Sequence, residues 1–225
     1  MTKIVWDQAG QRMYETGVEQ GVLYPMGAGG VYSAGVPWNG ITGITESPSG
    51  AEVSPQYADN MKYLNLVSKE EFGATIEAFM YPEEFAQCDG SAEIATGIKI
   101  GQQNRKQFGM CYKTRIGNDE NGEDHGYKLH IIYGALAAPS EKDYTTINES
   151  PEPMAFSWEI TTTPVPVTGR RPTANLEIDS TKVSAANLAA IENLLYGSAD
   201  AEPSLPRPDA ILALITPASN EGAAG

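Results

Sequence analysis

The chain has 225 residues, 15 of them Lys or Arg and 29 Asp or Glu, so its formal net charge at pH 7 is −14. This acidic excess argues against a protein that grips the phosphates of nucleic acid. The length suffices for one large domain with a substantial core. No stretch approaches the roughly 20 apolar residues of a membrane helix, and Met1–Trp6 lacks the apolar segment of a signal peptide. We therefore expect a soluble protein, made in a cytoplasm and without a membrane partner.

The glycine run and the two cysteines of the chain predict no cofactor or metal site. Gly27–Gly30 follows a proline, and no Gly-Lys-Ser/Thr completes a phosphate-binding loop, so we interpret it as a turn. Cys88 and Cys111 match no metal-ligand spacing. Without a secretion signal they are expected to be free thiols rather than a disulfide.

The stretch from Val36 to Asn65 is the one around which we expect the rest of the chain to be organised. Two β-prone runs, Val36–Thr45 and Met61–Val67, flank residues 46–60, which contain three acids and no basic residue. A loop of this length in a compact chain is typically functional or disordered until a partner binds it. We interpret 46–60 as an assembly loop on a long β-hairpin. Its candidate contact residues are Glu46, Ser47, Pro48, Ser49, Gly50, Glu52, Pro55, Tyr57, Asp59 and Asn60.

Alternating apolar and polar residues predict several further strands. The predicted strands are Phe72–Met80, Lys106–Ile116, Tyr127–Leu136, Met154–Thr162 and Ala174–Asp179. In the second of these, Phe108, Met110, Tyr112 and Ile116 form the buried face, and Gln107, Cys111, Lys113 and Arg115 form the wet one. Asn121-Gly122 is a strong turn signal, so the second and third strands are predicted to form a hairpin.

The tip of that hairpin is acidic and is the best candidate for a cation site in the sequence. It carries oxygen donors of the kind that calcium accepts. They are Asn118, Asp119, Glu120, Glu123 and Asp124. Their spacing does not match the EF-hand loop, so a solvated hairpin end is the favoured interpretation, and no metal site is assigned.

Residues 185–196 form the one helix that the pattern supports. Ser184 is a plausible N-cap, one face carries Leu188, Ile191 and Leu195, and Gly197 supplies the stop. We therefore divide the chain into a β domain, 1–197, and a proline-rich linker with a C-terminal tail, 198–225. A short apolar run in this tail is predicted to dock on the body of its own chain or on a neighbouring copy. Its candidate residues are Ile211, Leu212, Leu214 and Ile215.

A search for catalytic patterns favours a protein that is not an enzyme. The only histidines are His125 and His130, and neither has the neighbours of a nucleophilic triad. We interpret both as ordinary surface or sheet residues. The adjacent acids Glu83 and Glu84 are explained by the start of a helical turn. Aromatic residues interleaved with cations, the pattern of a nucleic-acid platform, are missing.

Six consecutive segments carry a resemblance to a known family. They read GVPWNGITGITESPSGAE, YADNMKYLNL, FGATIEAFMYPEEFAQCDGS, IGQQNRKQFGMCYKTRIGND, DHGYKLHIIYGALAAPSEKDY and FSWEITTTPVPV. In this order they resemble the major tail tube protein of long-tailed, non-contractile (siphovirus-type) bacteriophages, over roughly residues 1–197. The resemblance implies a mainly β fold, a tail-tube-type β-sandwich or barrel with one flanking α-helix.

The same resemblance implies a structural role in the virion. Copies would form hexameric rings that stack into the phage tail tube, a conduit for DNA ejection, assembled in the host cytoplasm. The implied partners are the protein itself and the tape measure, tail terminator and distal tail proteins, with phage DNA passing through without specific binding. No catalytic residue is carried over. Acidic residues facing the passage would repel the DNA backbone and let the duplex slide.

Two other functions stay open at the level of the sequence. The first is a monomeric virion β-sandwich that recognises carbohydrate or a host surface, with Trp38, Tyr57 or Tyr63 as an aromatic platform. The second is an enzyme of unfamiliar type, to which no motif points.

Overall fold

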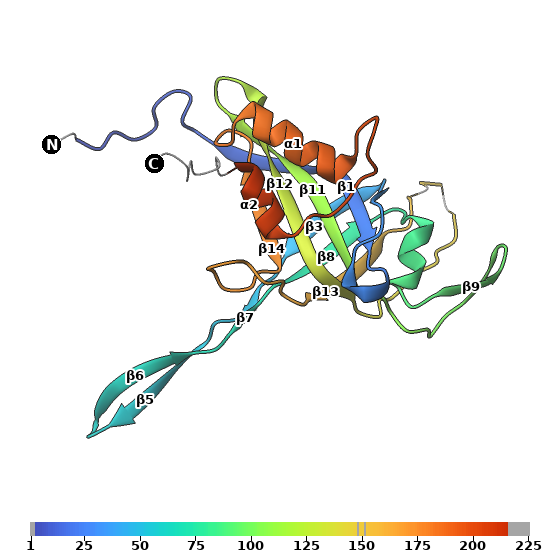
Figure 1. Cartoon of the computed structure of the whole chain (residues 1–225), viewed down its shortest axis with the longest axis horizontal. Helices are drawn as coiled ribbons and strands as arrows, with labels where there is room; N and C mark the ends of the chain where they lie inside the picture. The colour runs from blue at the N-terminus through green and yellow to red at the C-terminus, as the bar shows by residue number, and fades with distance from the viewer. Residues whose placement is uncertain (1–2, 148, 151, 216–225) are drawn as a thin grey trace, which may run out of the picture.

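The computed structural model describes residues 3–147, 149–150 and 152–215 of the chain. Within these ranges the fold is mainly β, with one eight-stranded antiparallel sheet, three two-stranded ribbons and two α-helices (Figure 1). The strand order in the large sheet is β2-β1-β11-β12-β13-β8-β3, and β14 also pairs with β12. The predicted mainly β fold is confirmed. Of the two predicted forms, sandwich or barrel, the described strands fit the sandwich, because they do not close into a barrel.

The strands of the large sheet include all the stretches that alternation predicts. Their bounds are β1 (Tyr14–Pro25), β2 (Val36–Pro37), β3 (Ile41–Glu46), β8 (Gly73–Ala78), β11 (Phe108–Asn118), β12 (Gly122–Ala137), β13 (Phe156–Thr162) and β14 (Asn175–Asp179). The hairpin predicted at Asn121-Gly122 is confirmed, since β11 and β12 pair antiparallel around it. The run Val36–Thr45 is divided in two, because Gly40 adopts a positive φ of 83° between β2 and β3.

Strand β12 turns a corner that folds the sheet onto itself. Its residues Lys128–Ile132 pair with β14, whereas Ala135–Ala137 pair with β13. Between them Gly134 has φ 58°, and a Cβ placed there would lie 2.4 Å from the carbonyl oxygen of Thr163. Only glycine takes this backbone without strain. The corner brings β13, β8 and β3 over the face of β1 and β11.

The space between the two halves of the sheet holds an aromatic core. Trp158, at its centre, is fully buried and contacts Trp38, Phe85 and Phe156 with ring centroids 5.1–5.8 Å apart. The indole nitrogen of Trp158 donates to buried Asp89 at 3.2 Å, and Asp89 is also 3.7 Å from the guanidinium of Arg105. The Lys142 ammonium donates to the other carboxylate oxygen of Asp89 at 2.5 Å. A buried carboxylate is tolerable here because these three partners satisfy it.

The opposite face of β11, β12 and β14 is covered by helices, which corrects one prediction. Helix α1 (Ala185–Tyr196) begins at the predicted N-cap, where the Ser184 side chain accepts from the backbone N–H of Asn187. It buries Leu188, Ile191 and Leu195, as predicted. One face of β11 was predicted to be exposed to water. At Cys111 this prediction is wrong, because the helices cover that face and Cys111 is fully buried. Alternation in one strand could not reveal this second cover.

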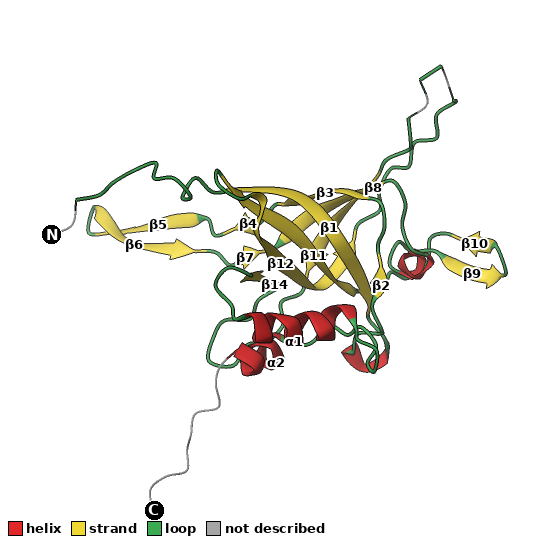
Figure 2. Ribbon diagram, turned by 90° about the horizontal axis from the view of Figure 1, so that it is seen from above, coloured by secondary structure: helices red, strands yellow, loops and turns green. Residues whose placement is uncertain are grey.

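A second helix also corrects the sequence-based picture of one flanking helix. Helix α2 (Pro208–Ile215) packs on α1, with Ile211 buried and Ile215 partly buried in the same core (Figure 2). The connection is anchored as well, because the Tyr133 hydroxyl donates to the Pro206 carbonyl at 3.1 Å. The apolar run thus docks on its own chain, and Leu212 and Leu214 stay exposed. Residues 216–225 of the predicted tail lie outside the described ranges.

Two elements complete the description of the chain. A short 3-10 turn, η2 (Glu83–Gln87), carries the predicted acids Glu83 and Glu84 in its first turn and buries Phe85. A small ribbon, β9 (Ala92–Ala95) with β10 (Ile98–Ile100), follows it. Across the described part of the chain, no helix is long and apolar enough to cross a bilayer.

Replacing Gly134 by alanine tests the corner in β12. We expect Gly134→Ala to lower the free energy of unfolding by about 2 to 4 kcal/mol, because it adds both left-handed backbone strain and a clash with Thr163. Urea denaturation measures the change. Gly169→Ala is the matched control, since Gly169 also has a positive φ, 71°, but a Cβ there meets nothing within 4 Å. Equal losses in the two variants would contradict the role of the corner.

Candidate assembly surface

The most exposed structured part of the molecule is a two-stranded arm, which we define as residues 47–72. It projects from the end of β3 and β8 and leads away from the body in both views (Figures 1 and 2). A short ribbon, β4 (Ser49–Gly50) with β7 (Glu70–Glu71), forms its base. A longer one, β5 (Val53–Ala58) with β6 (Met61–Val67), forms its outer part.

The arm corrects the interpretation of residues 46–60 as a loop. Glu46 ends β3, and Pro55 and Tyr57 lie within β5. The hairpin turn is at Asp59 and Asn60, which both have positive φ, 51° and 63°. Asp and Asn tolerate that backbone better than most residues and favour such two-residue turns. This dipeptide between two β-prone runs was the signal that could have placed the turn there.

Both faces of the outer arm carry exposed apolar side chains. Tyr57 and Tyr63 are each 71% exposed, and Leu66 is 56% exposed. The other large apolar residues exposed on the arm are Val53, Met61, Leu64 and Val67. A two-stranded hairpin is only marginally stable in water by itself. A contiguous apolar surface on such an element marks an interaction site.

The base of the arm is tied to the body through Glu46. The Tyr112 hydroxyl donates to Glu46 Oε1 at 2.7 Å, and His130 Nδ1 lies 3.6 Å from the same oxygen. The other ring nitrogen of His130 is 2.9 Å from the Thr114 hydroxyl and 3.5 Å from Glu15. His130 therefore links the end of β3 to the start of β1. Its side chain is only 12% exposed, and its ring stacks on that of Tyr112.

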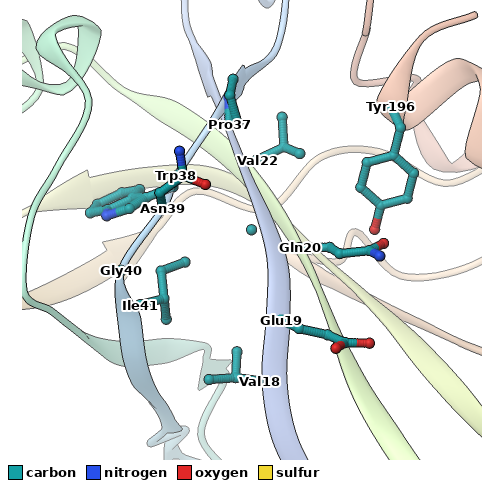
Figure 3. A pocket seen from close by; sticks show the side chains of 11 residues that line it. Val18, Glu19, Gln20, Val22, Pro37, Trp38, Asn39, Gly40, Ile41 and Tyr196 are labelled. Carbon is teal, nitrogen blue, oxygen red and sulfur yellow. The ribbon is translucent and has the colours of Figure 1, made fainter.

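A groove lies where β1 passes the connection between β2 and β3 (Figure 3). Its volume is about 560 Å³. Its apolar lining comes from Val18, Val22, Pro37, Ile41 and Trp38, with Tyr196 on the far side of β1. Strand β2 pairs only with Val22 and Leu23, so the edge of β1 from Tyr14 to Gln20 has no strand partner on that side among the described residues.

The acidic hairpin tip acts as an anchor for the N-terminal segment. Asp119 accepts from the backbone N–H of Gly10 at 3.0 Å and lies 3.6 Å from the guanidinium of Arg12. The Asn118 amide donates to the Gly10 carbonyl and contacts His125. Within the described ranges, no group of three or more acidic, histidine or cysteine side chains is arranged to hold a metal ion.

The outer face of β3, β8 and β13 differs from every other face of the sheet. It carries small hydroxyl residues, glycine and two glutamates, with no basic and no large apolar side chain. Register and burial assign to it Gly43, Thr45, Thr75, Glu77, Ser157, Glu159 and Thr161. Neither helix covers this face, because both helices lie on β11, β12 and β14.

The remaining candidates from the sequence are structural. Trp38 is 2% exposed and donates its indole N–H to the Met80 carbonyl, so it cannot belong to an aromatic platform. Cys88 and Cys111 are free and buried. Burial raises the pKa of the Cys88 thiol to about 12 and that of Cys111 to about 11, so neither provides a thiolate at neutral pH.

Comparisons with known proteins give only remote matches. No family model matches the chain, and no curated protein does. A chain in the cryo-EM structure of the anti-feeding prophage baseplate matches with 9% identity and a TM-score of 0.38, covering 78% of this chain and 97% of that one. A chain in the sheath-tube complex of the extracellular contractile injection system PVC, in its extended state, matches with 11% identity and a TM-score of 0.31. That match covers 71% of this chain and 88% of that one.

Glu46 makes the arm base sensitive to acid. The close approach of the His130 ring, together with the hydrogen bond that Tyr112 donates, lowers the pKa of Glu46 despite partial burial. A lowered pKa stabilises the fold above the unfolded-state pKa of glutamate, about 4.3. That stability is lost as the pH falls through the folded-state pKa. We expect Glu46→Gln to lower the melting temperature at pH 7, and to lower it progressively less as the pH falls below about 4.3. Glu52→Gln, on the exposed arm, is the control. A drop in the melting temperature of Glu46→Gln that does not change with pH would contradict the linkage.

Proposed function

We propose that this chain is a structural protein of a phage tail that assembles with copies of itself. The observation that carries the proposal is the arm, an apolar hairpin with neither face covered by its own chain. The sequence resemblance to major tail tube proteins supports the finer statement that copies form hexameric rings and that rings stack into a tube. In that role the protein works by contact and shape, without catalysis, metal or cofactor.

The position of the arm fits contact between copies better than contact with a small ligand. The arm presents a long, exposed surface and no concave site, whereas small-molecule sites are concave. Its apolar residues lie on both faces, so a single flat partner would leave one face in water. An arm that enters between two neighbouring copies would bury both faces. Such a contact joins different surfaces of the two copies, which is the arrangement that generates rings and filaments.

We further propose that the outer face of β3, β8 and β13 lines the passage for DNA. Glu77 and Glu159 supply negative charge there, and the absence of cations and large apolar residues removes groups that would hold a duplex. The helices then lie on the outside of the tube. The tape measure, terminator and distal tail proteins would contact the tube in this scheme, and the chain would reside in the virion.

Replacing the arm by a short turn tests the proposed assembly. Ser47 donates its backbone N–H to the Gly73 carbonyl, so β3 and β8 already approach each other at the base. We expect a variant with Asn-Gly in place of Pro48–Glu71 to fold as a monomer and to form no rings or tubes. Circular dichroism and negative-stain microscopy measure the two properties. A control variant outside the arm, Lys99→Gln in the exposed β10, is expected to assemble normally.

The outcomes of that experiment separate the functions that the sequence left open. Tubes formed without the arm would contradict its role, and an unfolded variant would show that the arm belongs to the core. Dispersed particles of the unaltered protein, with glycan affinity that requires Tyr57 and Tyr63, would instead support the monomeric binding module. These two tyrosines are the exposed aromatics that favour that alternative.

Removing charge from the outer face tests the proposed passage. We expect phage particles with Glu77→Gln and Glu159→Gln to assemble but to eject DNA more slowly, most clearly at low salt, because less repulsion keeps the duplex from the wall. Fluorescence of a dye that binds released DNA measures the rate. Glu83→Gln with Glu84→Gln removes the same charge from exposed positions elsewhere and is the control. An unchanged rate in the first variant would contradict this assignment of the face.

A further inference from the structure

The N-terminal segment exposes three consecutive large apolar side chains. Ile4 is 68% exposed, Val5 61% and Trp6 74%. Residues 3–9 lead away from the body in both views (Figures 1 and 2). An exposed run of this kind is costly in water unless a partner covers it. We call residues 3–6, Lys-Ile-Val-Trp, the strap.

The residues that follow the strap are held in place by hydrogen bonds. Asp119 holds the backbone N–H groups of Gly10 and Arg12, and the Arg12 guanidinium donates to the Asp7 carbonyl at 3.1 Å. Asp7 itself has a positive φ of 54°. The acidic tip thus fixes the chain up to Asp7 and directs the strap outward. Such anchoring reduces the entropy that the strap loses on binding.

The groove beside β1 has the size, chemistry and backbone edge to receive an extended peptide. Its volume, about 560 Å³, is at the scale of a few side chains and too small for the two strands of the arm. Its lining is largely apolar, and within residues 3–147, 149–150 and 152–215 no strand pairs with the adjacent edge of β1 from Tyr14 to Gln20. An added peptide can use such an edge for main-chain hydrogen bonds and the apolar lining for alternate side chains.

The charges beside the groove match the strap as well. Glu19 lies 2.8 Å from the guanidinium of Arg115, and Glu123 lies 3.9 Å from it. Two carboxylates therefore share one cation, which leaves one negative charge at the rim. Lys3 is the only charged residue of the strap and supplies the opposite sign. Complementary charges of this kind favour one orientation of a bound peptide.

We propose that the strap of one copy binds in the groove of a second copy, with Trp6 in the apolar part and Lys3 toward Glu19. This inference rests on the proposed self-assembly and names the surfaces that meet. The strap and the groove are different surfaces, so the contact is head-to-tail and leaves each copy with one strap to donate and one groove to fill. A head-to-tail contact closes into a ring when the rotation that relates one copy to the next is a whole fraction of 360°.

Photo-crosslinking from position 6 of the full chain tests the contact. p-Benzoylphenylalanine replaces Trp6 in an equal mixture of ¹⁴N- and ¹⁵N-labelled chains, which are mixed before assembly and irradiated afterwards. Cleavage after glutamate separates residues 20–46, which hold most of the groove, from 53–70, which hold the outer arm. We expect crosslinks to 20–46, with light chains joined to heavy chains in about half of the products, the proportion for random mixing.

Each other outcome overturns the proposal. Products that join only chains of the same label would show that the strap covers its own groove. Crosslinks to 53–70 would show that the strap meets an arm instead. Tubes that form without crosslinks to residues 20–46 would contradict the proposed strap–groove contact but would agree with the proposed function. Light–heavy products in dimers that never form rings or tubes would support the contact and overturn the proposed function.

Substitution of Trp6 provides a second readout that does not depend on the crosslinker. We expect Trp6→Ala to weaken self-association at least roughly tenfold, as loss of a central aromatic anchor does, while the melting temperature of the monomer stays unchanged. Trp6→Phe should retain most of the affinity. Tyr144→Ala removes an aromatic that is equally exposed, at 72%, and should have no effect. Equal affinities of Trp6→Ala and the unaltered chain, measured by sedimentation, would overturn the proposal.

Discussion

The structure depends on the burial of β11 and β12 on both faces. Trp158 and its aromatic neighbours cover one face, and α1 and α2 cover the other. Two buried faces require two separate covering layers, and the chain supplies them from segments that are distant in sequence. The corner at Gly134 is what permits this, because it lets one strand pair with β14 in one layer and with β13 in the next. The arm and the strap, two of the segments that are proposed to make contacts, lie outside these layers.

The two covering layers explain which apolar residues remain exposed to water. The core uses the large side chains of the central strands and helices, and buried polar groups such as Asp89 find partners there. The outer arm, residues 53–67, and the strap contribute nothing to that core, yet both are rich in large apolar residues. The net charge of −14 keeps such a chain apart from other molecules of the same sign, so the exposed apolar runs are the surfaces at which the proposed contacts between copies would form.

The local sequence pattern predicted most strands and helix α1, but it did not predict which other segments bury each of their faces. Alternation located the main strands, Asn121-Gly122 located the hairpin, and Ser184 with Gly197 located α1, because each of these signals acts within a few residues. The wet face assigned to Cys111 was wrong because its cover comes from residues almost 80 positions later. Trp38 was assigned to a surface for the same reason. The role of Glu46 depends on Tyr112 and His130, which only the folded sheet brings near it.

The arm shows how a functional proposal can be kept when the local structure on which it was based is corrected. Its low content of core residues and its length suggested a loop, but low burial reflects the absence of a covering partner and says little about strand pairing. Asp59 and Asn60 close a regular hairpin whose side chains alternate between two open faces. A flexible loop would lose much conformational entropy on docking, whereas a preformed hairpin loses less. The ordered arm is therefore a better assembly element than the loop that the sequence suggested.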